Sequence, residues 1–154
     1  MKQFSEGIVH FFQNQGCVLV SSIDSKGFPH SACKGLVKID KDGSIYLLDA
    51  YSGKTLQNLK NNPNASITAF DEHKFIGYCL KGKGRILLKE ELDAGIMKAW
   101  EDRITSRLTQ RLLKNIRGDV KGHPRHPEVL LPDPQHMIVF DVEEVVDLTP
   151  HHLK

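Results

Sequence analysis

Cysteine is scarce in this sequence, and its spacing excludes two classes of small protein. The three cysteines, Cys17, Cys33 and Cys79, lie far apart, and none belongs to a C-x-x-C pair. An odd number without short spacings is not typical of a disulfide framework or of a structural zinc site. We therefore expect reduced, buried thiols in a cytoplasmic protein.

Long hydrophobic runs and a large excess of charge are also missing. No stretch approaches the roughly 18 consecutive apolar residues that a membrane-spanning helix needs, and residues 1–16 contain no apolar signal-peptide core. The net charge is +2, which does not by itself favour nucleic acid or a membrane surface. The sequence predicts neither a membrane nor a nucleic-acid partner, and a small anionic ligand is compatible with it.

The periodicity of the apolar residues predicts strands that alternate with a few helices. The length of 154 residues and the 40% of hydrophobic residues are sufficient for one core, so we expect a single domain over residues 1–154. We expect strands at 17–23, 28–39, 44–48, 65–70, 75–88 and 136–148, and helices at 5–15, 53–61 and 90–115. Residues 116–135, rich in Pro, Gly, His and basic side chains, are expected to form an irregular basic excursion.

These short strands and their Gly-containing turns predict a mainly β fold with α-helices. The expected architecture is a closed or nearly closed, six-stranded antiparallel β-barrel with peripheral helices. Gly82 and Gly84 interrupt the fifth strand and predict a bulge or a sharp bend there. An open α+β sheet is the alternative, because strand patterning alone does not separate the two.

The segment Ser52-Gly53-Lys54-Thr55 is the strongest candidate for chemistry. A strand ends before it and a helix begins within it, and helix N-termini attract anions through unpaired N–H groups. Lys54 adds a full charge, and the hydroxyls of Ser52 and Thr55 can donate to phosphate oxygens. A nucleotide-binding P-loop would need glycine where Leu48 stands. The alternative is that Ser52 caps a surface helix and Lys54 is solvated.

A second candidate lies in the strand at 28–39, where Lys34 and Gly35 interrupt a β-type surface. Gly35 would let a planar ligand approach the backbone closely. Pro29, early in the strand, indicates an edge position. A twisted edge strand with a glycine bulge is therefore the alternative interpretation.

The third feature is a basic stretch between Arg103 and Arg125. Its side chains at positions 103, 107, 111 and 114 share one face of the expected helix. This face is either exposed to solvent or forms a basic lid that covers the flavin or meets an acidic substrate or redox partner. Trp100 falls on the apolar stripe of the same helix, so we expect it to pack in the core. The histidines have no metal-ligand spacing, and no metal site is expected.

The order of these segments resembles the pyridoxamine 5′-phosphate oxidase-like family of FMN-binding split barrels. The similarity runs from about Cys17 to Leu88 and includes the strand with Pro29, the Asp42-Gly43 turn, the loop with Lys54 and the string Asn61-Asn62-Pro63. The resemblance implies a split barrel, FMN as cofactor and a homodimer with the flavin between its subunits. Two arginines of the true pyridoxamine phosphate oxidases are replaced here by Ala32 and Gly53, so the chain resembles the broader group rather than the vitamin B6 enzyme.

The resemblance also implies roles for individual residues. Lys54 and Thr55, with Ser52 and Gly53, would bind the FMN phosphate, and Lys34 is expected to supply part of the charge that the absent arginines would have given. The backbone along the isoalloxazine ring would come from Ala32, Cys33, Lys34, Gly35, Leu36 and Val37, with Leu47 and Leu48 on the neighbouring strand.

We therefore expect an FMN-dependent oxidoreductase whose flavin carries the hydride or electron chemistry. Its substrate would be a small molecule or a redox partner, and the sequence names no catalytic residue. Two alternatives stay open: a non-catalytic flavin electron carrier or sensor, and the same barrel binding haem or a deazaflavin.

Overall fold

The structure, a computed structural model, describes residues 3–49, 53–117 and 131–154. The helices are α1 (Glu6–Gln13), α2 (Lys54–Asn61) and α3 (Ala94–Ile116), with short 3-10 turns at Lys89–Glu91 and His151–Leu153. The strands are β1 (Val18–Ile23), β2 (Pro29–Ile39), β3 (Ser44–Leu48), β4 (Asn64–Asp71), β5 (Ile76–Leu88) and β6 (His136–Asp147).

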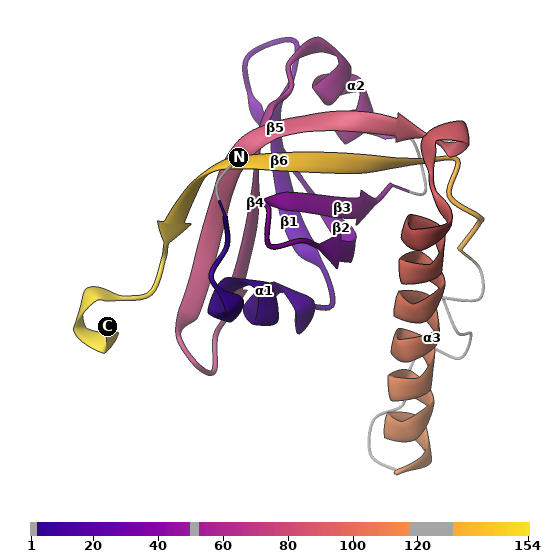
Figure 1. Ribbon diagram of the computed structural model, residues 1–154. Coiled ribbons are helices and arrows are strands. Elements are labelled where there is room, and N and C mark those ends of the chain that lie inside the picture. Colours follow the sequence, from indigo (N-terminus) through magenta and orange to yellow (C-terminus); the bar gives the residue numbers. More distant parts are fainter. Residues whose placement is uncertain (1–2, 50–52, 118–130) are drawn as a thin grey trace.

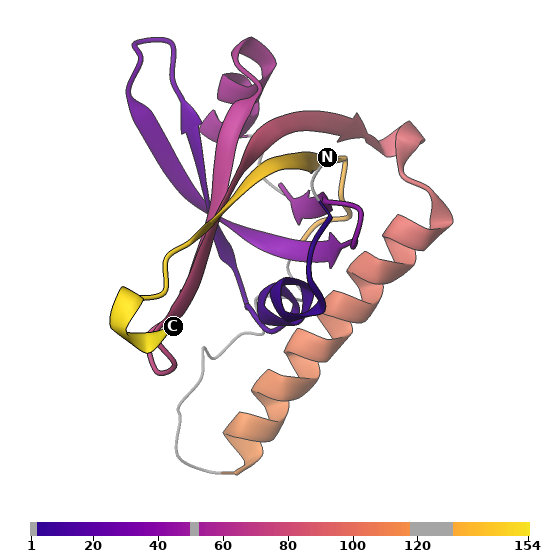
Figure 2. The ribbon, with the colours of Figure 1, turned by 60° about the vertical axis from the view of Figure 1, so that its left-hand side comes forward.

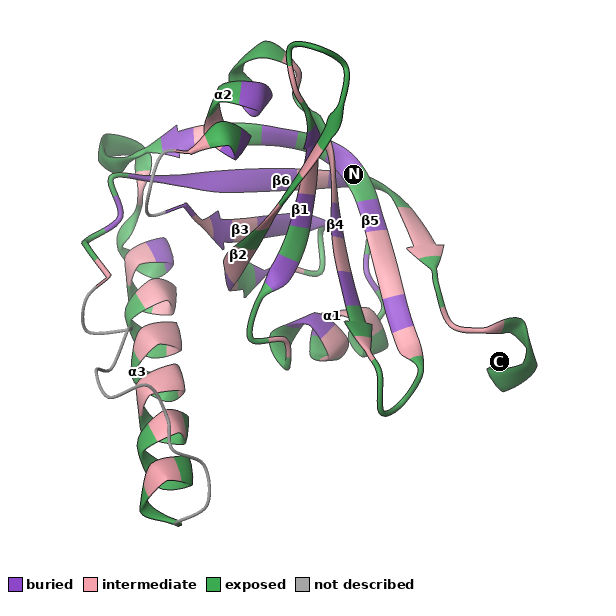
Figure 3. Ribbon diagram, turned by 180° about the vertical axis from the view of Figure 1, so that it is seen from behind, coloured by how far each residue is buried: buried purple, intermediate pink, exposed green. Residues whose placement is uncertain are grey.

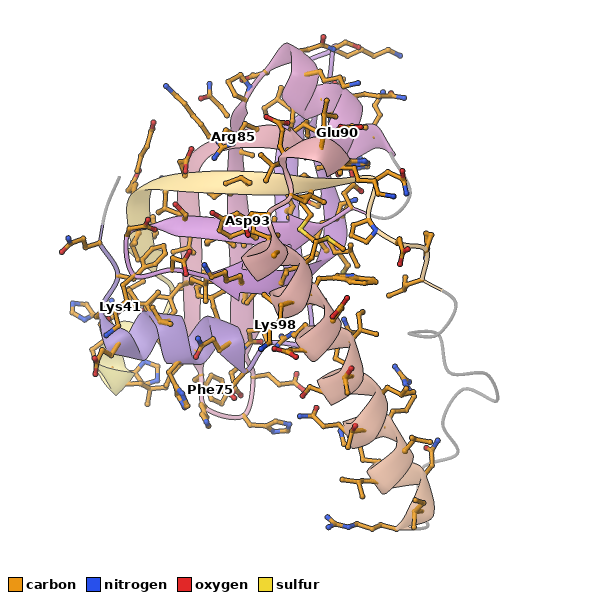
Figure 4. The ribbon with its side chains drawn as sticks, turned by 45° about the vertical axis from the view of Figure 1, so that its right-hand side comes forward. Lys41, Phe75, Arg85, Glu90, Asp93 and Lys98 are labelled. Atoms are coloured by element: carbon orange, nitrogen blue, oxygen red, sulfur yellow. The ribbon has the colours of Figure 1, made fainter. Side chains whose placement is uncertain are left out.

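Most element boundaries lie within two residues of those expected, and the start of the third helix is the main difference. The chain forms a 3-10 turn first, and α3 begins at Ala94 because the carboxylate of Asp93 accepts a hydrogen bond from the backbone N–H of Ile96 at 2.8 Å. Asp93 is visible at this start in Figure 4. Of the expected irregular excursion, residues 118–130 lie outside the described residues.

The strands form a closed antiparallel barrel in the order β1-β2-β3-β6-β5-β4, and β4 pairs with β1 to complete it. This closure decides against the open sheet. The edge position expected for Pro29 is confirmed locally, because the first half of β2 pairs with β1 and, among the described residues, with no second strand, whereas β3 pairs with the second half of β2. Pro29 is tolerated because it is the first residue of the strand.

The bulge expected at the glycines of β5 is confirmed. The register between β5 and β6 shifts at Lys81/Gly82, and β5 bends strongly along its length in Figures 1 and 2. A Cβ atom at Gly82 would lie 2.1 Å from the carbonyl oxygen of Asp141, so no side chain fits at this position. At Gly84 a Cβ atom would lie 3.0 Å from Leu59, so the glycine lets α2 pack tightly against β5.

The core occupies the barrel interior, and helices cover parts of the outside. Inward-facing side chains such as Ile45, Leu80 and Phe140 are at most 1% exposed, and α1 adds the fully buried Phe12. A second, smaller cluster lies outside the barrel, where α3 contributes Ile96 and Trp100. Trp100 therefore packs as expected.

The rest of α3 extends away from the barrel, as Figures 1 and 2 show. Figure 3 shows that exposed positions recur along this half of the helix. No helix among the described residues is long and apolar enough to cross a membrane.

The expectation of buried thiols is wrong for two cysteines. Cys17 and Cys33 are exposed, and Cys79 is half-buried. Cys33 faces outward on β2 opposite Leu19 of β1, which is 47% exposed. Side chains alternate between the two faces of a strand, and at these positions the outer face of the barrel is open to solvent.

Candidate cofactor site

At the start of α2, the N-cap residue makes no side-chain hydrogen bond to the first backbone N–H groups. Gly53 is the N-cap and offers no side chain to the first helical N–H groups. Lys54 is exposed and forms no ion pair with the described residues. The pKa of Asp24 is lowered mainly by hydrogen bonds from backbone N–H groups, and the charge of Lys54 adds to this effect. The expected contribution of Ser52 lies outside the described residues.

Thr55 provides the sharpest observation at this helix start. Its side chain is 1% exposed, and within the described part of the chain its Oγ1 atom has no hydrogen-bond partner. A buried hydroxyl without a partner costs about 1–3 kcal/mol. The hydroxyl is therefore placed to hydrogen-bond with a group that the described residues do not supply.

The helix is held in place by a buried polar contact and by its apolar side. The Nδ2 atom of Asn58 donates to the Oγ atom of Ser22 on β1 at 3.0 Å, and both side chains are buried. Leu59 joins the barrel core one residue later. The N-terminus of α2 is thus fixed against the barrel, where it also packs on β2 and β5.

A charged network lies inside the barrel, where β3 ends. The ammonium of Lys34 forms an ion pair with Oδ1 of Asp49, and Nε2 of His136 lies 3.0 Å from Oδ2 of the same carboxylate. The three side chains are 13%, 0% and 8% exposed, in that order. All three point inward because they continue the inward-facing positions of β2, β3 and β6.

The neighbours of Asp49 favour its ionised form. Burial acts to raise the pKa of Asp49, but the hydrogen bonds and charges of Lys34 and His136 outweigh it and hold the pKa below its usual range. The ammonium of Lys34 is therefore already neutralised by Asp49. Its expected role as extra phosphate charge stays a prediction, and it would require the ammonium to leave this carboxylate.

The strand predicted to lie along a flavin ring presents two different faces. Ala32, Lys34 and Leu36 point into the barrel, whereas Cys33, Gly35 and Val37 point outward. The side chains of Leu36 and Leu47 are 2% and 0% exposed, so these two positions can offer a ligand only their backbone. Leu48 faces outward opposite Gly35.

The basic face of α3 lies over this outward surface. A Cβ atom at Gly35 would lie 3.8 Å from Nη1 of Arg107. Arg103 donates from Nη1 to the carbonyl oxygen of Gln13 at 2.9 Å and from Nη2 to that of Gln15. A simple solvated face is thus wrong for Arg103, whose pKa is lowered by burial and by the neighbouring charge of Arg107.

A groove follows the same helix face. It has a volume of about 200 Å³ and is lined by Gly16, Arg107, Gln110, Arg111 and Lys114. The three basic side chains share one face of α3, as the sequence predicts. No group of three or more His, Cys, Asp or Glu side chains in the described ranges could hold a metal ion.

Sequence reasoning missed Asp49 and His136 as members of one cluster. The two residues are 87 positions apart and meet only because β3 pairs with β6, with Leu48 opposite Met137. The sequence shows that both residues lie at strand ends, and the alternation of side chains along each strand places both on the inner face of the barrel. The missing information was which strands are neighbours.

Comparison with known proteins assigns the chain to a family. The family model described as pyridoxamine 5′-phosphate oxidase matches residues 4–147. The chain belongs to this family. The prediction from the resemblance is confirmed, and the closed barrel agrees with it.

Solved structures similar to this chain include both a protein named as FMN-binding and one named as a haem storage protein. HupZ of Group A Streptococcus is 17% identical, with a TM-score of 0.66 and coverage of 95% of this chain and 94% of that one. A pyridoxamine 5′-phosphate oxidase-related, FMN-binding protein of Nostoc punctiforme is 12% identical, with a TM-score of 0.56 and coverage of 92% and 82%. HutZ, the haem storage protein of Vibrio cholerae, is 13% identical, with a TM-score of 0.53 and coverage of 95% and 94%.

At these identities the likeness concerns the fold. No curated protein matches this chain. The choice of ligand therefore rests on the residues of the site itself.

Proposed function

We propose that this protein is an FMN-binding flavoprotein that holds the flavin phosphate at the start of α2. The observation that carries the proposal is the buried hydroxyl of Thr55, which has no hydrogen-bond partner among the described residues and lies beside a helix N-terminus whose N-cap, Gly53, has no side chain. A phosphate oxygen would accept hydrogen bonds from this hydroxyl and from the first N–H groups of α2, and the ammonium of Lys54 would neutralise its charge.

The flavin ring would lie along the outward backbone of β2, near Cys33 and Gly35, with Leu48 beside it. Gly35 supports this placement because it has no side chain to hold a planar ring away from the strand. The guanidinium of Arg107 lies over Gly35, and it would contact the edge of a ring bound there. Leu36 and Leu47 would act through the backbone, since their side chains belong to the core.

The proposed activity is that of an oxidoreductase. When bound, FMN supplies the hydride or electron chemistry, and the protein binds the flavin, orients it and limits the access of water. Among the described residues we assign no general acid or base. We propose a homodimer in which the second copy covers the outward face of β1 and β2, where Leu19 is 47% and Ile23 37% exposed.

The test begins with the absorption spectrum and the mass of any ligand that copurifies. Flavin bands and the mass of FMN support the proposal, whereas a Soret band would favour haem. The protein freed of ligand is then titrated with FMN. Lys54→Ala is expected to weaken binding by about 1.5–3 kcal/mol, roughly 10- to 150-fold in Kd, the value of a hydrogen bond to a charged group.

Lys60→Ala is the matched control, because Lys60 is exposed in the last turn of the same helix. Its affinity for FMN is expected to stay within about twofold of the unsubstituted chain, as for a solvated surface charge. Unchanged FMN affinity in Lys54→Ala would overturn the phosphate assignment.

A further inference from the structure

The groove along α3 has two walls. One wall is the helix face with Arg107, Arg111 and Lys114, and the other is the loop at Gly16. Arg103 joins the walls, because its guanidinium donates to two backbone carbonyl oxygens just before Gly16 in the chain. The separation of the two walls is therefore set by contacts within the chain itself.

The charge in this groove is of one sign. From position 103 to position 117 the sequence contains five basic residues and no Asp or Glu, and no acidic side chain is among the described residues that line the groove. The repulsion between these cations contributes at Arg103, whose pKa is lowered first by burial and then by the charge of Arg107. Like charges four residues apart on a helix are destabilising, so a bound anion would relieve this repulsion.

The groove adjoins the place proposed for the flavin ring. Arg107 lines the groove and also lies over Gly35, where a Cβ atom would be 3.8 Å from its Nη1 atom. The groove volume of about 200 Å³ is smaller than the roughly 300–1,000 Å³ of pockets that enclose a whole ligand. It therefore suits the charged end of a small molecule whose remaining part reaches the edge of the ring.

The groove stays accessible in the proposed dimer. The half of α3 that forms it extends away from the barrel (Figures 1 and 2), whereas the second copy is assigned to the outward face of β1 and β2. At Gly16 a Cβ atom would meet nothing within 4 Å, so the loop wall has open space in front of it. An anion can therefore enter from the side of Gly16 and Lys114.

We propose that this groove binds the anionic end of a substrate that exchanges electrons with the flavin. The substrate class is a small molecule that carries phosphate or carboxylate groups. Its oxygens would accept hydrogen bonds from the side chains of Arg107, Gln110 and Lys114. Only the electron exchange rests on the proposed flavin site, because the binding of the anion needs the groove alone.

The first test locates an anion on the ligand-free chain. Inorganic pyrophosphate is titrated into isotope-labelled protein at about 0.1 M ionic strength, and backbone and side-chain amide signals are followed by NMR. We expect saturable shifts at the backbone amide of Gly16 and the side-chain amide of Gln110. They should persist in the Lys54→Ala/Thr55→Val double variant, which lacks the proposed flavin phosphate site. Shifts confined to the start of α2, or no saturable shift, would overturn the proposal.

Charge changes in the groove give the second test. Gly16→Asp adds a carboxylate where space is open, and Gly16→Asn adds nearly the same volume without charge. Pyrophosphate should bind about two- to fivefold more weakly to Gly16→Asp than to Gly16→Asn, the scale of one exposed charge pair. Lys114→Gln should weaken binding by a similar factor.

Lys98→Gln is the matched control for Lys114→Gln. Lys98 lies on the same helix (Figure 4), 16 residues before Lys114, which is about 24 Å along the axis and beyond the screening length of about 10 Å at this ionic strength. Its substitution should leave pyrophosphate affinity unchanged. Equal affinities of Gly16→Asp and Gly16→Asn, or equal effects of the two lysine substitutions, would contradict binding in the groove.

The third test uses the FMN-loaded chain after photoreduction, with ferricyanide as the anionic oxidant and hexaammineruthenium(III) as the cationic one. Each ion takes one electron, so two ions oxidise one reduced flavin, whose protons pass to the solvent. When each rate is divided by that of free riboflavin with the same oxidant, we expect about a tenfold preference for ferricyanide. Gly16→Asp should reduce this preference, and Lys98→Gln should not.

The outcomes separate the substrate assignment from the flavin site. Equal normalised rates for the two oxidants would overturn the anionic substrate while the flavin site stands. A chain that binds no flavin would instead refute the proposed function, and the pyrophosphate shifts at Gly16 and Gln110 would then decide the anion site by themselves.

Discussion

Replacing Asp49 by asparagine tests the charged network inside the barrel. The carboxylate of Asp49 is 0% exposed and contacts both Lys34 and His136. The substituted side chain would keep the shape but leave the ammonium of Lys34 buried beside a neutral amide. Removing one partner of a buried pair costs about 3–5 kcal/mol. Because the side chain of Lys34 is still 13% exposed, we expect the lower end, about 3 kcal/mol.

The assay is urea denaturation followed by circular dichroism, together with thermal unfolding. A loss of about 3 kcal/mol should lower the Tm by roughly 6–12 °C in a chain of this length. Asp40→Asn is the control, because Asp40 pairs with Lys38 at 2.7 Å but both side chains are about a third or more exposed. It should cost at most about 1 kcal/mol. The reasoning is refuted if Asp49→Asn costs no more than Asp40→Asn.

The same substitution has a defined dependence on pH. The pKa of Asp49 is lower in the folded chain than its ordinary value, so the carboxylate stabilises the fold above its unfolded pKa of about 3.9. This stabilisation is lost as pH falls through the folded pKa. The stability difference between the unsubstituted chain and Asp49→Asn should therefore be full near neutral pH and shrink below about pH 4. A difference that stays constant into this acidic range would contradict the assignment.

Two further predictions concern packing and the anchoring of α3, both measured by urea denaturation. Gly82→Ala should lower the free energy of unfolding by about 3 kcal/mol or more, because its Cβ atom would lie 2.1 Å from the Asp141 carbonyl oxygen. Gly16→Ala is the control, because a Cβ atom at Gly16 would meet nothing within 4 Å. Equal losses in the two variants would contradict the close approach at Gly82. Arg103→Ala should cost about 1.5–3 kcal/mol because it removes the hydrogen bonds to Gln13 and Gln15, whereas Arg117→Ala, at an exposed position, should cost less than about 0.5 kcal/mol.

Local signals explain why so much of the barrel could be predicted from sequence. Gly27 and Gly43 adopt positive φ angles of 84° and 99° in the turns between successive strands, as a hairpin requires. The bulge at Gly82 was likewise indicated by the glycines of the strand itself. Each of these features depends on neighbours within a few positions, which the sequence displays directly.

Features that depend on strand order could not be predicted in the same way. Asp49 and His136 meet across β3 and β6, and the apolar or polar pattern of either strand does not name its neighbour. The exposure of Cys17 and Cys33 depends on where the helices cover the barrel, which strand periodicity does not determine. Lys54 was found because the junction of strand and helix is local, but the burial of Thr55 follows from the docking of α2 on the barrel.

The central claim is that the start of α2 binds a phosphate, and the most direct test compares FMN with riboflavin, which lacks that phosphate. With Lys54 and Thr55 present, FMN is expected to bind about 100-fold more tightly than riboflavin, the combined effect of one charge-assisted and one neutral hydrogen bond. In the Lys54→Ala/Thr55→Val double variant this ratio should fall towards one while the riboflavin affinity is retained. Equal affinities in the unsubstituted chain, or an unchanged ratio in the double variant, would contradict the account.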